Sequence, residues 1–210
     1  MLIPAVIPFK PRNPKTRLSC ILDQAERENF AEMMLADVIG AAEGAGCIPL
    51  ILSTEAYKFS DYQVLVNTAG LNEALNDLLS KTPGPVLILM ADLPLATGDA
   101  VKRMVTESAG MSIVPGRGGG TNAIFLSSGE SYRVDYYGAS FLKHMRIAEE
   151  RGLLCEVIDS FRLHTDVDEK EDLVELLIHG RGKSRACLEE LGFRLLIEKG
   201  RVGIVREEKA

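Results

Sequence analysis

The chain has 210 residues, of which 46% are hydrophobic and 26% charged, an ordinary balance for a soluble protein with one sizeable core. Its formal net charge of −6 argues against a general nucleic-acid binder, because such proteins gain affinity from Lys and Arg that neutralise phosphates. No stretch approaches the roughly 18 apolar residues of a membrane span, and the N-terminus is apolar too briefly for a secretory leader, so we expect a cytoplasmic protein. The four cysteines are scattered along the chain, so we expect reduced thiols.

Short runs rich in Val, Ile and Leu alternate with longer amphipathic segments, the pattern of an α/β protein with a mostly parallel sheet. Strands are predicted at 2–9, 48–53, 63–66, 86–90, 112–114, 122–126 and 155–158, and helices at 24–45, 71–79, 99–108, 140–151, 170–179 and 184–191. The tail ends in a predicted hairpin, 193–198 and 202–206, which is a reasonable place for a homodimer contact. Without repeats or linkers in the sequence, residues 1–210 are expected to form a single domain.

The segment after the first strand, residues 10–17 (KPRNPKTR), brings four cations into an otherwise acidic chain. Ligands of open α/β sheets bind outside the carboxyl ends of the strands, so this position is informative. Two prolines stiffen the backbone, and Lys10, Lys15 and Arg17 are candidates to bind a triphosphate. A solvated charge run is the alternative. The sequence has neither a P-loop nor a G-x-G-x-x-G motif, so these cations and other turns must hold the phosphates of any bound nucleotide.

The predicted helix at 71–79 begins with Leu-Asn-Glu, and Asn72 is a candidate to contact a nucleotide base through an exocyclic group. An ordinary helix start explains the same residues equally well.

The wholly apolar strand at 86–90 is followed by Asp92 and then Leu-Pro. A carboxylate at the mouth of a buried strand needs a cationic partner, and Mg²⁺ is a natural one. A turn in which Asp92 accepts backbone N–H bonds is the alternative.

Two polar segments suggest an anion site, one just before the predicted strand at 122–126 and the other just before the predicted helix at 140–151. Residues 116–122 (GRGGGTN) form a glycine-rich turn that lets backbone approach a ligand, and Thr121 adds a hydroxyl, although a plain flexible loop is commoner. Gly138 admits a tight turn before Ser140, which can cap the helix, and a helix N-terminus attracts anions. His144 lies one turn further on the same helix face, where a lone His is more often a packing residue.

The acidic turn at 164–172 (HTDVDEKED) precedes the helix predicted at 170–179. Asp168 and Glu171 have the spacing of a capping box, which gives both a structural explanation. Asp166 has none. Because it alternates with apolar Val167, it is expected to face a cleft and to supply a second metal carboxylate together with Asp92, unless it is a surface aspartate.

Taken in order, these segments resemble the 2-phospho-L-lactate guanylyltransferase family of deazaflavin coenzyme F-420 biosynthesis, within the Rossmann-like nucleotidyltransferases that include molybdenum-cofactor guanylyltransferases. The matching segments are 7–10 (IPFK), 15–19 (KTRLS), 70–75 (GLNEAL), 91–95 (ADLPL), 119–123 (GGTNA), 140–144 (SFLKH) and 166–168 (DVD). The resemblance implies a three-layer sandwich of the nucleotide-diphospho-sugar transferase type and transfer of GMP from GTP to 2-phospho-L-lactate or phosphoenolpyruvate, with release of pyrophosphate.

The resemblance also implies site residues. Metal, expected to be Mg²⁺, falls on Asp92 and Asp166, and the phospho-acid falls on Thr121, Gly138 and Ser140. The chain departs from the family at 137–140 (YGAS), where members often carry Gly-x-Gly-Ser. The predicted catalytic residues are the two aspartates with Lys15 and Arg17, which screen the triphosphate.

Three alternative functions remain open from the sequence. One is nucleotidyl transfer to a different phosphorylated acceptor. Another is a sugar-nucleotide-dependent glycosyltransferase, although the usual D-x-D is missing because Asp92 is followed by Leu-Pro-Leu. The third is a nucleotide-binding regulatory module without catalysis. Pyrophosphate release from GTP that depends on a phospho-acid distinguishes nucleotidyl transfer from the last two.

Overall fold

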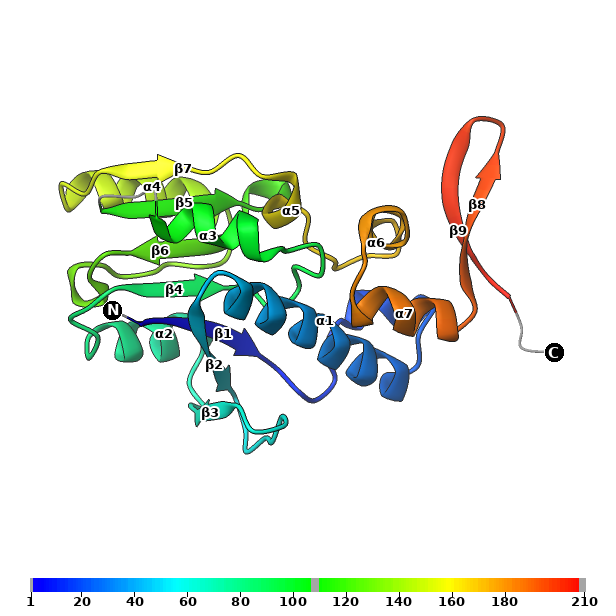
Figure 1. The fold of residues 1–210 in the computed structure, drawn as a ribbon, viewed down its shortest axis with the longest axis horizontal. Helices are drawn as coiled ribbons and strands as arrows, with labels where there is room; N and C mark the ends of the chain where they lie inside the picture. The colour runs from blue at the N-terminus through cyan, green and yellow to red at the C-terminus, as the bar shows by residue number, and fades with distance from the viewer. Residues whose placement is uncertain (1, 107–109, 208–210) are drawn as a thin grey trace.

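A computed structural model of the chain describes residues 2–106 and 110–207, and in this part a seven-stranded sheet forms the centre (Figure 1). Its order is β3-β2-β1-β4-β6-β5-β7. The strands are β1 (Ile3–Phe9), β2 (Cys47–Ser53), β3 (Gln63–Val66), β4 (Val86–Leu89), β5 (Met111–Pro115), β6 (Thr121–Leu126) and β7 (Cys155–Val157). The mainly parallel α/β sheet predicted from the alternating apolar runs is confirmed.

Helices cover both faces of this sheet and produce three layers. On one face lie α1 (Gln24–Gly44), α3 (Gly98–Thr106), α5 (Phe161–His164), α6 (Asp172–His179) and α7 (Lys183–Glu190), and their apolar residues share one core cluster. On the other face lie α2 (Leu71–Leu79) and α4 (Ser140–Glu150), which contribute Leu75 and Ala148 to a second cluster. Short 3-10 helices occur at Thr16–Cys20, Arg117–Gly119 and Gly129–Ser131.

Strand β6 determines which residues meet at the edge of the sheet. It runs antiparallel to both of its neighbours, β4 and β5, whereas β1 is parallel to β2 and β4. The first residue of β6, Thr121, therefore lies at the same edge as the carboxyl ends of β1 and β4. This arrangement places the glycine-rich turn beside the segments that follow Phe9 and Leu89.

Helix α1 begins with a complete capping box. The Asp23 carboxylate accepts a hydrogen bond from the backbone N–H of Glu26 at 2.9 Å, and the Glu26 carboxylate accepts one from the N–H of Asp23 at 3.0 Å. These bonds satisfy two donors that a helix start otherwise leaves free. Beyond the cap, Phe30, Met34 and Val38 recur at four-residue spacing and are buried against the sheet.

The tail folds into the predicted hairpin, β8 (Phe193–Glu198) and β9 (Arg201–Arg206), as a separate two-stranded sheet. Figure 1 shows it projecting away from the main sheet at the C-terminal end of the molecule. Its base is anchored by Arg206, which donates to the backbone carbonyl of Ile21 at 2.9 Å and pairs with Glu26. Several of its apolar side chains are exposed, with Ile197 72% and Val202 47% accessible.

The predicted helix and strand boundaries agree with the structure within two residues, but the capping interaction predicted at the acidic turn does not. The helix predicted from residue 170 begins at Asp172, and the capping box assigned to Asp168 and Glu171 is wrong. Instead the Asp172 carboxylate accepts the N–H groups of Asp168 and Glu169, at 2.9 and 2.8 Å. The side chain of Asp168 is thereby free for another contact.

The helix predicted at 99–108 is observed as Gly98–Thr106, and residues 107–109 lie outside the described part of the chain. The single domain spanning 1–210 stays a prediction. Within the described residues, every helix is too short or too polar to cross a membrane.

Candidate active site

Lys15 connects the first strand's loop to two distant carboxylates. Its ammonium lies 2.8 Å from Oδ2 of Asp92 and 2.6 Å from Oδ1 of Asp168, with only 11% of its side chain exposed. Burial on its own lowers the pKa of Lys15, but the two carboxylates outweigh it and raise that pKa above its ordinary value. Lys15 is therefore a permanent buried cation at the mouth of β4.

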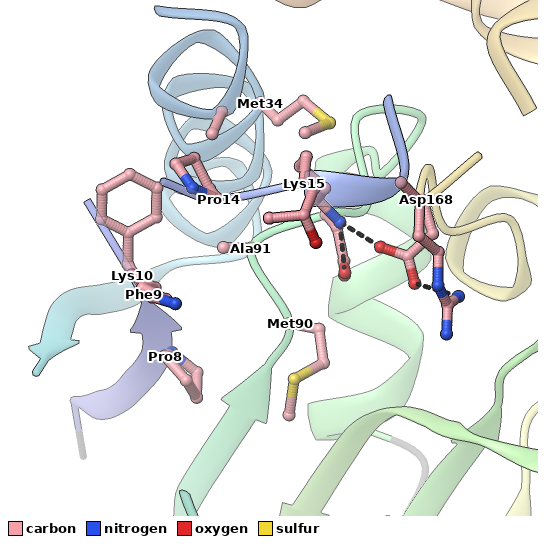
Figure 2. Close-up of a pocket in the computed structure, with 13 residues that line it drawn as sticks. Pro8, Phe9, Lys10, Pro14, Lys15, Met34, Met90, Ala91 and Asp168 are labelled. Carbon is pink, nitrogen blue, oxygen red and sulfur yellow. Dashed lines mark hydrogen bonds and ion pairs between the residues drawn. The ribbon is translucent and has the colours of Figure 1, made fainter. Parts of the chain in front are cut away.

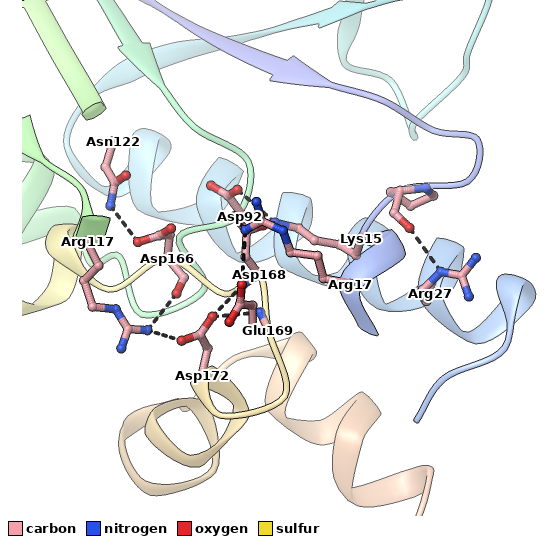
Figure 3. Close-up of polar contacts among 11 residues, drawn as sticks. Lys15, Arg17, Arg27, Asp92, Arg117, Asn122, Asp166, Asp168, Glu169 and Asp172 are labelled. Carbon is pink, nitrogen blue, oxygen red and sulfur yellow. Dashed lines mark hydrogen bonds and ion pairs between the residues drawn. The ribbon is translucent and has the colours of Figure 1, made fainter. Parts of the chain in front are cut away.

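Asp168 is the residue that the sequence assigned to a helix cap. Burial raises the pKa of its carboxyl, but the charge of Lys15, its hydrogen bond and the charge of Arg17 outweigh burial, so the net pKa is lowered. Arg17 is mostly exposed and lies 3.8 Å from Asp168 and 3.4 Å from Glu169. The basic loop and the acidic turn thus face each other across the edge of the sheet (Figure 3).

The basic loop is held in place by a buried arginine of α1. The Arg27 guanidinium donates to the carbonyls of Pro14 at 3.2 Å and Leu22 at 3.0 Å and to the Asn13 side chain at 2.8 Å. Asn13 and Lys15 both adopt left-handed backbone conformations, with φ of 46° and 49°. Non-glycine residues adopt that conformation at some energetic cost, which the bonds from Arg27 offset.

A cavity of about 300 Å³ lies between this loop, α1 and the end of β4. Figure 2 shows Lys15 reaching toward Asp168, with Phe9 on the side away from Asp168, and Met34 of α1 also lines the cavity. Lys10 and Arg17 also line it. The cavity therefore combines cations suited to phosphates with apolar side chains suited to a flat organic group.

Asp166 lies near Asp92 and lacks an ion pair among the described residues. Its carboxylate accepts a long hydrogen bond of 3.4 Å from the Asn122 amide, which also donates to the carbonyls of Leu163 and His164 (Figure 3). Burial raises the pKa of Asp166, and the negative charge of Asp92 raises it further. Two neighbouring carboxylates that raise a pKa in this way are a donor set that a hard divalent cation would stabilise, so the residues fit such an ion.

No group of three or more His, Cys, Asp or Glu side chains in residues 2–106 and 110–207 is arranged to hold a metal ion alone. The turn that carries Asn122 is instead built for close approach. A Cβ on Gly116 would lie 2.3 Å from Oδ1 of Asn122, so glycine is required there for Asn122 to reach Asp166. Arg117 joins the same turn to the acidic segment by donating to the Asp166 carbonyl at 3.2 Å and pairing with Asp172.

The three residues predicted to bind a phospho-acid lie together beside the start of α4. The Ser140 hydroxyl is 3.1 Å from the Thr121 hydroxyl, and the Ser140 N–H donates to the Gly138 carbonyl at 2.9 Å. A Cβ on Gly119 would lie 3.9 Å from Cα of Ala139, so the glycine-rich turn contacts this segment. Gly138 has φ of 60° with open space beside its Cα, as a tight turn requires.

Comparison with known proteins identifies the family. A family model described as "Guanylyl transferase CofC like" matches residues 3–207. A protein of Methanoregula boonei named 2-phospho-L-lactate guanylyltransferase is 60% identical, over 96% of this chain and 94% of its own length. A protein of the same name from Methanosphaerula palustris is 58% identical, over 96% and 97%.

The chain belongs to the guanylyl transferase CofC-like family. The fold agrees with this assignment. A solved structure described as a putative nucleotide-diphospho-sugar transferase from Desulfovibrio desulfuricans superposes with a TM-score of 0.74 at 15% identity, covering 90% of this chain and 95% of that one. The predicted nucleotide-diphospho-sugar transferase fold is thereby confirmed.

Within this CofC-like chain, Asn72 is engaged in a way that the sequence did not indicate. Its side-chain amide accepts the N–H of Tyr136 at 2.7 Å and donates to the Tyr136 carbonyl at 3.3 Å. It lines a groove of about 850 Å³ between α2 and the segment before α4, and it does not line the cation-bearing cavity. Its contact with a nucleotide base stays a prediction.

Three residues of the CofC-like site were missed from the sequence: Asp168 as the partner of Lys15, Arg27 as the support of the basic loop, and Asn122 as the partner of Asp166. A signal existed for Asp168, because alternation around buried Val167 places Asp166 and Asp168 on the same side of the backbone. Arg27 and Asn122 had no comparable local signal.

Proposed function

We propose that this chain transfers GMP from GTP to the phosphate of 2-phospho-L-lactate, giving lactyl-2-diphospho-5'-guanosine and pyrophosphate. Relatives with this name are 60% and 58% identical over nearly the whole chain, which supports the guanylyltransferase activity. The observation that carries the proposal is the contact of Lys15 with Asp92. It places a buried cation and carboxylates suited to a metal ion at the sheet edge where the Thr121–Ser140 pair also lies. Phosphoenolpyruvate is the alternative acceptor.

The reaction is an in-line displacement at the α-phosphorus of GTP. An oxygen of the acceptor phosphate forms the new bond to phosphorus, and the bond to the bridging oxygen of the β-phosphate breaks, so that pyrophosphate leaves with the electron pair. A phosphate monoester has a second pKa near about 6 and is already ionised at neutral pH, so no general base is required. The protein's work is to position both anions and to neutralise their charge.

The cations of the basic loop perform most of this neutralisation in the proposal. Lys15 is buried, charged and fixed by two carboxylates, so it can stabilise charge that develops on the departing pyrophosphate at little reorganisation cost. Lys10 and Arg17 line the same cavity and contact the outer phosphates. Mg²⁺, held by Asp92 and Asp166, would supply charge neutralisation between the two phosphates that react.

The acceptor occupies the other end of the site in the proposal. Thr121 and Ser140 offer hydroxyl donors, and the first turn of α4 offers free N–H groups with a favourable dipole. In the described part of the chain, the N-cap residue of α4 is Ala139, whose side chain makes no capping hydrogen bond. A carboxylate or phosphate can therefore take the place of the missing cap.

The hairpin β8–β9 is proposed as a homodimer contact. An isolated two-stranded hairpin is marginally stable in water, and this one exposes Leu196, Ile197 and Val202. A second copy of the chain that covers these side chains would bury them. The compartment proposed is the cytoplasm, where GTP is available.

The experiment that tests the function measures pyrophosphate release with each of the four nucleoside triphosphates, with and without each candidate acid, in the presence of Mg²⁺. We expect release with GTP only when 2-phospho-L-lactate or phosphoenolpyruvate is present. Equal release with all four nucleotides, or release without any acid, would contradict the proposal. Loss of activity with a chelator and recovery with Mg²⁺ tests the metal separately.

A further inference from the structure

His144 is a fully buried histidine of α4 whose two ring nitrogens both have partners. Nε2 lies 3.0 Å from the backbone nitrogen of Asp135, and Nδ1 lies 2.9 Å from the hydroxyl oxygen of Thr121. The ring packs edge-on against Tyr136, with centroids 4.9 Å apart. Its position is thus fixed on three sides.

The partner of Nε2 decides where the ring proton lies. A backbone N–H can only donate, so Nε2 must accept and carries no proton. Burial lowers the pKa of His144 to about 4, and the ring is neutral at neutral pH. Its single proton therefore lies on Nδ1, and His144 donates a hydrogen bond to Thr121.

The backbone N–H that sets this tautomer is itself held on both sides. The Asn76 side chain accepts a hydrogen bond from the Val134 N–H at 2.8 Å and donates one to the Val134 carbonyl at 3.1 Å. Asn72, one helical turn earlier on α2, makes the same two hydrogen bonds with the backbone of Tyr136. Asp135 lies between these two residues. The pair of asparagines consequently holds the Asp135 N–H in place against the ring.

With the ring proton on Nδ1, the Thr121–Ser140 pair keeps one hydroxyl proton that no neighbouring described group accepts. The two hydroxyls have two protons, and one of them forms the bond from Ser140 to Thr121. Because His144 donates to Thr121, it takes neither proton. One hydroxyl proton then has no acceptor among the described residues. If the ring proton were on Nε2 instead, Nδ1 would require a hydroxyl proton and the pair would have none to spare.

We propose that His144 is a positioning residue that makes the Thr121–Ser140 pair a hydrogen-bond donor toward an anionic oxygen of the acceptor. The inference rests on the proposed function, because it assigns the spare proton to the phospho-acid. The Thr121 hydroxyl lies 3.1 Å from the hydroxyl of Ser140, the first residue of α4, where the N-cap residue Ala139 supplies no side-chain cap. His144 thus acts on the substrate through Thr121 and does not touch it.

Two isosteric variants separate the two contacts of the ring. In His144→Asn the amide nitrogen takes the place of Nδ1 and donates to Thr121, whereas in His144→Gln the amide oxygen takes the place of Nε2 and accepts from Asp135. We expect His144→Gln to raise KM for the acceptor at least about tenfold and His144→Asn to raise it less than about threefold, since only the former loses the donor to Thr121 that directs the spare hydroxyl proton toward the acceptor. KM for GTP stays unchanged, and His179→Asn, at a half-buried histidine of α6 that pairs with Glu175, is the control.

A cycle with Thr121→Val tests whether His144 acts through Thr121. Valine keeps the shape and removes the hydroxyl, so His144→Gln is expected to have little further effect on acceptor KM in the Thr121→Val background. Losses that multiply, or equal losses in the Asn and Gln variants, would overturn the inference. Acid-independent pyrophosphate release by the wild type would instead contradict the proposed function, so the two failures are distinguishable.

The tautomer can also be measured without any variant or activity. In protein with labelled histidine ring nitrogens, nitrogen–proton correlation spectra distinguish protonated from unprotonated ring nitrogens. We expect His144 to show a protonated Nδ1 and an unprotonated Nε2 at neutral pH. The reverse assignment, or a doubly protonated ring, would overturn the inference even if every variant failed to fold.

Discussion

The ammonium of Lys15 lies 2.8 Å from the carboxylate of Asp92, although 77 residues separate them in the chain. The contact joins the loop after β1 to the end of β4, two neighbouring parallel strands. It leaves Asp166, whose pKa is raised by burial and by Asp92, as the carboxylate most in need of a further cation. Of the two carboxylates proposed to hold the metal, Asp92 is thus already paired with a cation and Asp166 is not, among the described residues.

Asp92→Asn is expected to lower kcat at least about 100-fold, because it removes one of the two carboxylates proposed to hold the metal that neutralises the reacting phosphates. The free energy of unfolding should change by less than about 1 kcal/mol, since Asp92 is partly exposed and Lys15 keeps its bond to Asp168. Steady-state kinetics and urea unfolding measure the two effects.

The matched control for this variant is Asp77→Asn, which neutralises an exposed carboxylate of α2 that pairs with Lys81. It is expected to keep wild-type kinetics. Near-normal turnover in Asp92→Asn would contradict the metal assignment, whereas an equal loss in both variants would indicate a general effect of charge.

Arg27→Lys is expected to loosen the basic loop. Lysine cannot reproduce the planar donor set that contacts Pro14, Leu22 and Asn13, so buried acceptors lose partners. We predict a loss of about 2 kcal/mol of unfolding free energy and an increase of about tenfold in KM for GTP. KM for the acceptor should stay near its wild-type value, and an increase in both KM values would contradict a role specific to the loop. The exposed Arg146→Lys is the control.

The sequence predicted the strands, the sheet class and the family well because each depends on local signals. The apolar strands, the short segments at their ends and their order along the chain are all visible in one dimension. The family is confirmed by the match over residues 3–207, and the fold by the solved neighbour. The residues predicted to bind metal, nucleotide and acceptor stay predictions.

What the sequence could not predict depends on contacts between distant segments. Asp168 was interpreted as a cap because a capping spacing is a frequent local pattern, yet Asp172 forms the turn and Lys15 takes the Asp168 carboxylate. His144 was interpreted as a packing residue because nothing nearby in sequence indicates Thr121, 23 residues earlier. Antiparallel β6, which brings them together, has no signal in the apolar pattern.

His144 also predicts a pH dependence of stability. Its pKa is about 4 in the folded protein because of burial, against an ordinary value of about 6.5, so between these values the unfolded chain binds a proton that the folded protein does not. Stability therefore falls as the pH is lowered through this range. From about pH 7 to about pH 5 the contribution is about 2 kcal/mol of unfolding free energy.

The measurement is urea unfolding of the wild type and His144→Asn at both pH values. Other groups contribute equally to both proteins, so the wild type should lose about 2 kcal/mol more than the variant. An equal loss would show that His144 is not held neutral by burial.

Ile197→Lys is expected to weaken the proposed dimer. The side chain is 72% exposed in the single chain, so the substitution should cost the folded monomer less than about 0.5 kcal/mol. A buried, unpaired ammonium in a dimer interface would be much more costly. Sedimentation of the wild type should show a dimer, and the variant should shift toward monomer. A monomeric wild type would contradict the dimer, and an unchanged dimer in the variant would place the interface elsewhere.

The most direct test of the central claim follows the oxygen atoms of the acceptor. 2-Phospho-L-lactate labelled with heavy oxygen in its phosphate is incubated with the enzyme, unlabelled GTP and Mg²⁺, and both products are examined by mass spectrometry. Direct attack on the α-phosphorus predicts that all of the label is in the guanosine diphosphate-bridged product and that one unlabelled pyrophosphate forms for each product molecule. Label in the pyrophosphate, or pyrophosphate accompanied by GMP without the bridged product, would contradict it.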